Sequence, residues 1–322
     1  MASWIKKDLL DIQSLSQEEI GLILDTARSL REVSAREVKK VPALRGKTVV
    51  SLFFEDSTRT RASFELAAKR LSADTLNVSA KGSSLSKGET ILDTARNIQA
   101  MNVDAIIMRH SVAGTPKLLA DNLNAAVINA GDGMREHPTQ ALLDIFTMRE
   151  RLGDLKGKQI AIIGDILHSR VARSNIWGLT KLGAKVTLCG PSTLMPIGIE
   201  KLGVDVTYDV ADVIDQSDVL MLLRIQLERQ KDKFLPSLRE YAKRFGINSD
   251  KLKKAKKDVL IMHPGPTNRG LELSADVADG EYSVILNQVT NGVAIRMAIL
   301  YLLLAGADTS KQKDYKEVNK KS

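Results

Sequence analysis

The segment Lys47 to Arg61, KTVVSLFFEDSTRTR, constrains the fold of this chain more than any other stretch. Thr48 to Phe54 is short, β-branched and aromatic and follows Gly46, a pattern that predicts a buried strand. Ser57 is then a favourable N-cap, and the residues after it carry apolar side chains at helical spacing. The segment therefore predicts a strand that ends in a turn and leads directly into a helix.

The first turn of this predicted helix has an unusual charge. Acidic side chains normally occupy a first turn, because its unpaired N–H groups carry positive partial charge. Arg59 and Arg61 stand there instead. Such a turn repels itself unless an anion neutralises it, and phosphate is the usual guest at a helix N-terminus. We predict a phosphate site. The alternative is a solvated, capped helix, since helix-end charges contribute only about 0.3–1 kcal/mol.

The rest of the chain alternates between strands and helices in two successive series. Alternation of this kind predicts an α/β fold with two doubly wound lobes, each a parallel β-sheet with helices on both faces. The turn GDLKGK, after a long helix that begins at Pro138, is the best boundary between the lobes. We predict a first domain of residues 1–152 completed by a returning helix 289–306, a second domain of residues 153–288, and a disordered tail 307–322.

Length and cysteine content narrow the class of protein. A chain of 322 residues can bury full cores for two domains. Its single cysteine, Cys189, excludes an intramolecular disulfide and fits a reducing compartment. Lys6, Lys7 and Asp8 interrupt the N-terminal segment, so it lacks the apolar centre of a signal peptide. These features predict a cytoplasmic protein with no membrane association.

The net charge of +8 raises the alternative of a nucleic-acid-binding protein. Residues 228–258 hold 11 basic against 5 acidic residues, and residues 308–322 hold 5 against 3, which accounts for the whole excess. Neither segment interleaves aromatic side chains as a base-stacking surface does. A nicotinamide enzyme is also disfavoured, because the turn after the strand 159–165 has only Gly164 of the G-x-G-x-x-G pattern. We predict neither function.

Polar clusters stand at the carboxyl end of one predicted strand after another, where open parallel sheets bind ligands. Each has a structural alternative: the histidine and glutamine of HPTQ can cap their own helix, Arg109 can form a structural ion pair, Arg224 can extend into solvent, and HPGP can be a stiff turn. Their shared position favours a binding site. The clusters are STRTR, Arg109-His110, HPTQ, Asp165 to Arg170, Arg224 to Gln226, and HPGP.

Taken together, FFEDSTRTR, SSLSKGET, DAIIMRH, NAGDGMREHPTQALLD, GD-x4-R and HPGP resemble the aspartate/ornithine carbamoyltransferase family in the same order over roughly residues 1–306. The resemblance implies transfer of the carbamoyl group of carbamoyl phosphate to an amino group, in the cleft between the lobes. Aspartate is the implied acceptor, which would make the reaction a step of pyrimidine biosynthesis. Ornithine is the alternative, but the acidic residue and Ser-Met-Gly loop that it requires are missing around Arg224.

The resemblance also implies residue roles. Ser57, Thr58, Arg59 and Thr60 would bind the phosphate; Thr60, Arg109 and His137 would converge on the carbamoyl oxygen. The side chain of Gln140 and the Gly265 carbonyl, in a turn set by a cis bond to Pro266, would accept from the carbamoyl amino group. Arg170 and Arg224, with Gln226 beside them, would clamp the aspartate carboxylates. Lys87, with Ser83 or Ser84, would reach the site of a neighbouring subunit, so that a homotrimer shares its active sites. The implied catalytic residues are Arg59, Thr60, Arg109 and His137.

The charges of this residue set suit the reaction. The two substrates bring roughly four negative charges, about two of them on the phosphate. Five cations would balance them and let two anions approach each other: Arg59, Lys87, Arg109, Arg170 and Arg224. The reaction needs no covalent nucleophile, metal or organic cofactor, and the four histidines lack metal-ligand spacing. The resemblance leaves open whether regulatory chains or other enzymes of the pyrimidine pathway bind. The functional alternative is a non-catalytic, anion-binding member of the family.

Overall fold

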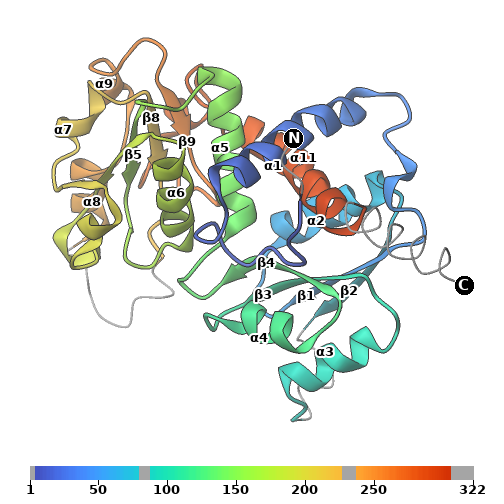
Figure 1. Ribbon diagram of the computed structural model, residues 1–322. Helices are drawn as coiled ribbons and strands as arrows, with labels where there is room; N and C mark the ends of the chain where they lie inside the picture. Colours follow the sequence, from blue (N-terminus) through green and yellow to red (C-terminus); the bar gives the residue numbers. More distant parts are fainter. Residues whose placement is uncertain (1–3, 80–87, 227–236, 306–322) are drawn as a thin grey trace, which may run out of the picture. The chain divides into compact units, whose positions relative to one another are not determined.

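The computed structural model describes residues 4–79, 88–226 and 237–305 (Figure 1). Contacts divide the chain into two compact units, which are described separately: unit 1 comprises Met1–Thr139 and Asn291–Ser322, and unit 2 comprises Gln140–Thr290. The sequence predicted the first boundary after residue 152, at the end of a long helix. The contact-based division falls near the start of that helix instead.

Unit 1 contains a four-stranded parallel sheet with the strand order β2-β1-β3-β4. Alternate side chains of β1, β3 and β4 pack on α3 and α4 in one apolar core, and Figure 1 shows α2 on the other face of the sheet. The strands are β1 (Thr48–Phe53), β2 (Asp74–Ser79), β3 (Ala105–His110) and β4 (Ala126–Asp132). The α-helices are α1 (Gln17–Arg31), α2 (Thr58–Arg70), α3 (Ile91–Gln99) and α4 (Thr115–Asn122).

Unit 2 contains a five-stranded parallel sheet with the strand order β7-β6-β5-β8-β9. Side chains of the central strands form its core with α7, α8 and α10. The strands are β5 (Gln159–Ile163), β6 (Lys185–Cys189), β7 (Asp205–Thr207), β8 (Val219–Leu222) and β9 (Leu260–Met262). The helices are α6 (Arg170–Lys181), α7 (Ala211–Ile214), α8 (Leu238–Arg244), α9 (Ser249–Leu252) and α10 (Ala275–Ala278).

Two helices cross the division between the units: α5 (Pro138–Leu152) and α11 (Ile285–Leu304). In unit 1, Arg296 of α11 donates to the hydroxyl of Ser63 at 2.9 Å, and its guanidinium lies 5.0 Å from the ring centre of Phe64. These contacts attach the returning helix to α2. In the described part of the chain, no helix is both long enough and apolar enough to cross a membrane.

The structure confirms the predicted fold class of two parallel α/β sheets. A capping box begins α1: the Ser16 hydroxyl accepts from Glu19 N, and the Glu19 carboxylate accepts from Ser16 N. The final helix begins at Ile285, four residues before the predicted start at residue 289. Residues 253–258, in the lysine-rich segment, follow the short helix α9 as turns and loop rather than continuing it, because the charged run has no apolar face to bury.

Candidate active site

Each sheet has one point where the chain reverses the direction in which it adds strands. In unit 1, β2 lies on one side of β1 and β3 on the other. In unit 2, β6 and β7 lie on one side of β5, and β8 lies on the other. Ligands bind beyond the carboxyl ends of strands at such switch points, because the connections diverge there and leave a crevice. The predicted phosphate and carboxylate residues follow these strand pairs.

At the switch point of unit 1, β1 leads into α2, the helix whose first turn contains basic side chains. Ser57 is the N-cap of α2, yet within the described residues its side chain accepts no capping hydrogen bond. Thr58 and Arg59 are exposed, whereas Thr60 is only 7% exposed. The Arg61 guanidinium lies 5.5 Å from the ring centre of Phe53, so this arginine has a structural contact of its own. The helix end thus presents N–H groups beside basic side chains.

Arg109 is the penultimate residue of the neighbouring strand β3 and lies directly opposite Phe53 of β1. Its Nη1 donates to the carbonyl of Ala130 at 2.9 Å, and its Nε lies 3.5 Å from a carboxylate oxygen of Glu55. The predicted structural ion pair of Arg109 is therefore present. The same contacts hold the guanidinium at the carboxyl end of β3. The adjacent strand, β1, leads into α2.

The turn before His137 is built on a fully buried carboxylate, Asp132. It accepts from the Asn129 amide at 2.9 Å, from Glu136 N at 3.1 Å and from Gly114 N at 2.8 Å. This turn leads into α5 and leaves His137 only 4% exposed.

His110, next to Arg109, lies edge-on to the ring of Phe54 with 5.1 Å between ring centres. Its Nδ1 accepts from Val112 N at 2.9 Å. Burial lowers the pKa of His110, because desolvation penalises the imidazolium. The neutral ring is therefore favoured beside the cationic strand end.

In unit 2, the ends of β5 and β8 approach each other closely. Gly164 has a φ of +132°, and a Cβ there would lie 2.8 Å from the carbonyl oxygen of Leu223. The buried carboxylate of Asp165 accepts from the ring of His168 at 2.9 Å and from Gln226 N at 3.3 Å. The Gln226 amide in turn donates to the carbonyl of His168 at 3.1 Å. Asp165 thus joins the two strand ends at the switch point.

Two further contacts place the predicted arginines of unit 2. Ser169 caps α6 by accepting from Ala172 N at 3.1 Å, and Arg170 follows it with 7% exposure. Arg224 precedes Ile225, whose N–H donates to the buried carboxylate of Glu272 at 2.9 Å. Burial raises the pKa of Glu272, because the surrounding apolar core penalises its charge.

The turn after β9 also contains predicted residues. The Gly265–Pro266 bond is cis, as the resemblance implied, and Gly265 has a φ of +66°. Gly265 N donates to His263 Nδ1 at 2.8 Å, and His263 N donates to the amide oxygen of Gln288 at 3.0 Å. Gln140 does not follow the predicted capping alternative; its amide donates to Asp144 at 2.9 Å.

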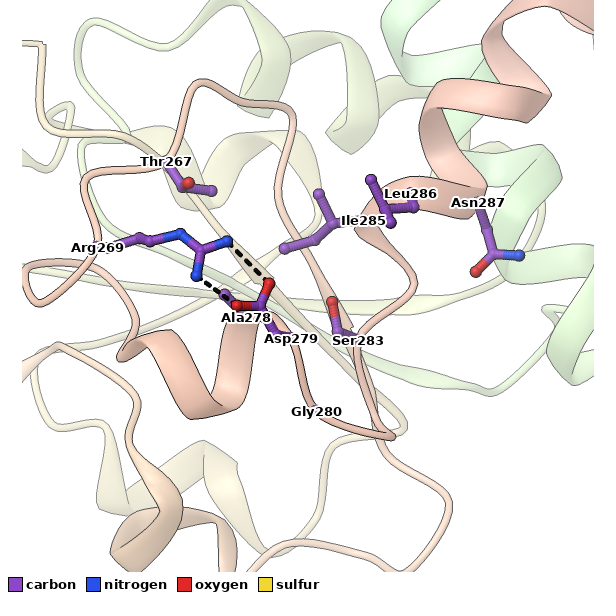
Figure 2. A pocket seen from close by; sticks show the side chains of 9 residues that line it. All are labelled: Thr267, Arg269, Ala278, Asp279, Gly280, Ser283, Ile285, Leu286 and Asn287. Carbon is purple, nitrogen blue, oxygen red and sulfur yellow. Dashed lines mark hydrogen bonds and ion pairs between the residues drawn. The ribbon is translucent and has the colours of Figure 1, made fainter.

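A surface pocket of about 350 Å³ lies beside this turn, between Thr267 and the start of α11 (Figure 2). Both terminal nitrogens of Arg269 bind the exposed carboxylate of Asp279 at its wall. The other lining side chains are both apolar and polar: Ala278, Ile285 and Leu286, and Thr267, Ser283 and Asn287. It contains none of the predicted site residues. In the described residues, His, Cys, Asp and Glu side chains form no group of three or more that could hold a metal ion.

Comparison with known protein families identifies the family of this chain. Residues 7–150 match the family described as "Aspartate/ornithine carbamoyltransferase, carbamoyl-P binding domain". Residues 156–303 match its "Asp/Orn binding domain". The chain belongs to the aspartate/ornithine carbamoyltransferase family.

Individual carbamoyltransferases support this membership. The "Aspartate carbamoyltransferase catalytic subunit" of Gemmatimonas aurantiaca is 60% identical over 306 residues, 95% of this chain and 96% of that protein. The protein of the same name from Syntrophus aciditrophicus is 60% identical over 300 residues, 93% of this chain and 98% of that protein. The aspartate transcarbamoylase of Trypanosoma cruzi, solved with carbamoyl phosphate and aspartate, has a TM-score of 0.85 at 31% identity, covering 94% of this chain and 98% of that one. The ornithine carbamoyltransferase of Pyrococcus furiosus has a TM-score of 0.83 at 32% sequence identity, and the match covers 95% of this chain and 99% of that one.

The family and the transferase class predicted from the sequence are confirmed. Lys87, Ser83 and Ser84 lie outside the described residues, so their predicted contribution to a neighbouring subunit stays a prediction. The sequence-predicted cluster Asp165 to Arg170 includes one of the buried carboxylates that fix strand ends and turns, but sequence reasoning missed three others: Asp132, Asp144 and Glu272. Of these, only Asp144 had a clear sequence signal, its position one helical turn after Gln140.

Proposed function

We propose that this carbamoyltransferase transfers the carbamoyl group of carbamoyl phosphate to the amino group of L-aspartate, giving N-carbamoyl-L-aspartate and phosphate. One observation carries the choice of chemistry: basic side chains follow the strands at the switch point of each sheet. In unit 1 they lie beside the start of α2, where the Ser57 side chain makes no capping hydrogen bond within the described residues, and in unit 2 they are Arg170 and Arg224. The first suits a phosphate, and the second suits a dicarboxylate. Aspartate as acceptor is supported by the 60% identity to catalytic subunits named for it.

The proposed reaction requires positioning and charge stabilisation. The aspartate amine attacks the carbamoyl carbon, a C–N bond forms, and the carbonyl oxygen gains negative charge. Thr60, Arg109 and His137 stabilise that oxygen; a single well-placed donor in such a site typically contributes about 3–4 kcal/mol. The C–O bond to phosphate then breaks, and the leaving phosphate accepts the amine proton. No residue of the chain becomes covalently modified.

The assembly belongs to the same proposal. We infer a homotrimer in which Lys87 and Ser84 complete the site of a neighbouring subunit, which rests on the family resemblance of SSLSKGET. A mixture of an inactive Lys87→Ala chain and an inactive Arg59→Ala chain tests it. Recovery of activity on mixing is expected if subunits share sites, and no recovery would contradict it.

The reaction is tested by measuring phosphate release from carbamoyl phosphate with aspartate and, separately, with ornithine. Aspartate-dependent release is expected. Release with ornithine alone would retain the phosphate site but overturn the acceptor. Release with neither would favour the non-catalytic alternative.

A further inference from the structure

Asp144 is a fully buried carboxylate in unit 2 that no predicted role explains. Its Oδ1 accepts from the side-chain amides of Gln140, at 2.9 Å, and Gln288, at 2.7 Å. Its Oδ2 accepts from the amide of Asn175 at 3.0 Å. Three side chains from α5, α6 and α11 therefore turn their NH₂ groups toward one carboxylate.

The chemistry of Asp144 determines the direction in which these amides point. Both carboxylate oxygens of Asp144 accept amide N–H donors, whereas an amide has a donating and an accepting end. Gln140 and Gln288 must therefore direct their nitrogens to Asp144 and their oxygens away from it. For Gln288 the partner of that oxygen is the N–H of His263, at 3.0 Å. For Gln140 the oxygen is the end left for a ligand.

The second arm of the network reaches the turn that carries Gly265. The backbone N–H of His263 donates to the side-chain oxygen of Gln288, and Nδ1 of His263 accepts from Gly265 N at 2.8 Å. The Gly265 N–H, and with it the start of the turn that carries the Gly265 carbonyl, is therefore linked through His263 and Gln288 to Asp144 Oδ1. In the proposed function, the Gln140 oxygen and the Gly265 carbonyl are the two acceptors of the carbamoyl amino group.

We propose that Asp144 is a positioning residue that orients the Gln140 amide with its oxygen available as an acceptor and, through Gln288 and His263, holds the turn that carries the Gly265 carbonyl. It thereby makes the enzyme selective for an acyl phosphate bearing NH₂. The inference rests on the proposed function. A methyl group in place of NH₂ fills the same space but leaves two acceptors unpaired. Each unpaired group weakens binding by roughly 10- to 100-fold.

A purely structural role for Asp144 gives a different expectation. A carboxylate that only ties α5, α6 and α11 together would weaken every ligand alike when removed. A carboxylate that orients Gln140 and Gly265 affects only ligands that donate a hydrogen bond at the carbamoyl position. The ratio of affinities for two acyl phosphates separates the two roles.

The experiment measures the dissociation constants of carbamoyl phosphate, acetyl phosphate and inorganic phosphate on the full chain. The unmodified chain is expected to prefer carbamoyl over acetyl phosphate by at least roughly 10-fold, from the loss of one hydrogen bond or more. In Asp144→Ala this preference falls below about 5-fold, because Gln140 can rotate. The affinity for inorganic phosphate stays within about 3-fold, since no donor at the carbamoyl position is involved.

Two variants serve as rescue and control. Asp144→Asn can keep its oxygen toward the glutamines and turn its NH₂ to Asn175, whose buried Oδ1 has no hydrogen-bond partner in the described chain. It is therefore expected to retain most of the preference. Thr139→Val removes a buried hydroxyl that likewise lacks a partner among the described residues, one position before Gln140, and is expected to retain all of it. A matching loss in Thr139→Val would overturn the proposal.

The remaining outcomes are also decisive. Equal weakening of all three ligands in Asp144→Ala, or an unchanged preference, overturns the positioning role. If Asp144→Ala does not fold, Gln288→Met breaks only the arm to His263 and should narrow the preference partly; an unchanged ratio there overturns the proposal. Absence of any preference in the unmodified chain would instead contradict the proposed function, which keeps the two failures distinct.

Discussion

The helices α2 and α6 occupy equivalent places in the two units and differ in how their first turns are satisfied. Each follows the first strand of its sheet, begins after a serine, and has an arginine but no acidic residue in its first turn. Ser169 caps α6 with a bond from Ala172 N at 3.1 Å. Ser57 makes no such bond in the described part of the chain. Arg59 is exposed, whereas Arg170 is buried.

This difference separates two ways to bind an anion. At α2 the first-turn N–H groups are not taken by the cap, so the helix end itself can bind a phosphate. At α6 the serine already occupies one of these groups, so recognition falls to the side chain of Arg170. A planar guanidinium suits a carboxylate, which it can bind through two parallel hydrogen bonds. The comparison therefore predicts distinct losses when each first turn is changed.

The largest effect is expected for Arg59→Ala. Loss of the principal phosphate cation should lower turnover by about 10²–10³-fold, the scale for removing one preorganised charge-stabilising group. Steady-state phosphate release checks it, with Arg61→Ala as the matched control in the same turn. Arg61 contacts the Phe53 ring, so its loss should change stability slightly and activity little. Wild-type turnover in Arg59→Ala would contradict the phosphate assignment.

The second effect concerns α6 alone. Arg170→Lys keeps the positive charge but cannot form the two parallel hydrogen bonds that a guanidinium makes to a carboxylate. It should therefore raise the KM for aspartate by about 10-fold or more. The dissociation constant of carbamoyl phosphate should not change, since the two helix starts bind different anions. Arg173→Lys, one turn away and bonded to the Leu167 carbonyl, is the control. If Arg170→Lys weakened the binding of aspartate and of carbamoyl phosphate equally, the two helix starts would not bind different anions.

A smaller effect sharpens the comparison of the two caps. Ser169→Ala should lower the free energy of unfolding by about 1 kcal/mol, the usual cost of losing a side-chain cap. Ser57→Ala should cost much less stability but weaken phosphate binding. Urea unfolding and phosphate titration of both variants measure the two quantities. A stability loss at Ser57 as large as at Ser169 would show that both serines act as caps.

The smallest effect is a pH dependence of stability near the first anion site. Burial lowers the pKa of His110 below its usual 6.5, so the unfolded chain binds more protons than the folded one just below that pH. Stability should therefore fall as the pH drops below about 6.5, by less than about 1 kcal/mol because His110 is partly exposed. His110→Asn, whose oxygen can accept from Val112 N, should remove this dependence in urea unfolding from pH 7.5 to 5.5. If the free energy of unfolding of His110→Asn keeps the same dependence on pH, a group other than His110 causes it.

The candidate site shows how far sequence reasoning reached. The repeated strand–helix pattern placed STRTR, Arg109, Arg170, Arg224 and HPGP at strand ends, because consecutive parallel strands direct their carboxyl ends to one edge of a sheet. It left open whether the HPTQ glutamine caps its own helix. The hydrogen bond from Gln140 to Asp144 answers that question, and the same Asp144 oxygen also accepts from Gln288, which is 144 residues away in the sequence.

The sequence alone determined the α/β class, the two sheets and the order of their elements, because hydrophobic periodicity and turn residues act locally. The family followed from the resemblance of its motifs. Only the tertiary structure decided which of two similar serines caps its helix, which buried carboxylates fix the strand ends, and which end of the Gln140 amide remains for a ligand. A buried donor or acceptor must find a partner wherever the fold provides one. Those partners come from segments far apart in the chain, so no local pattern records them.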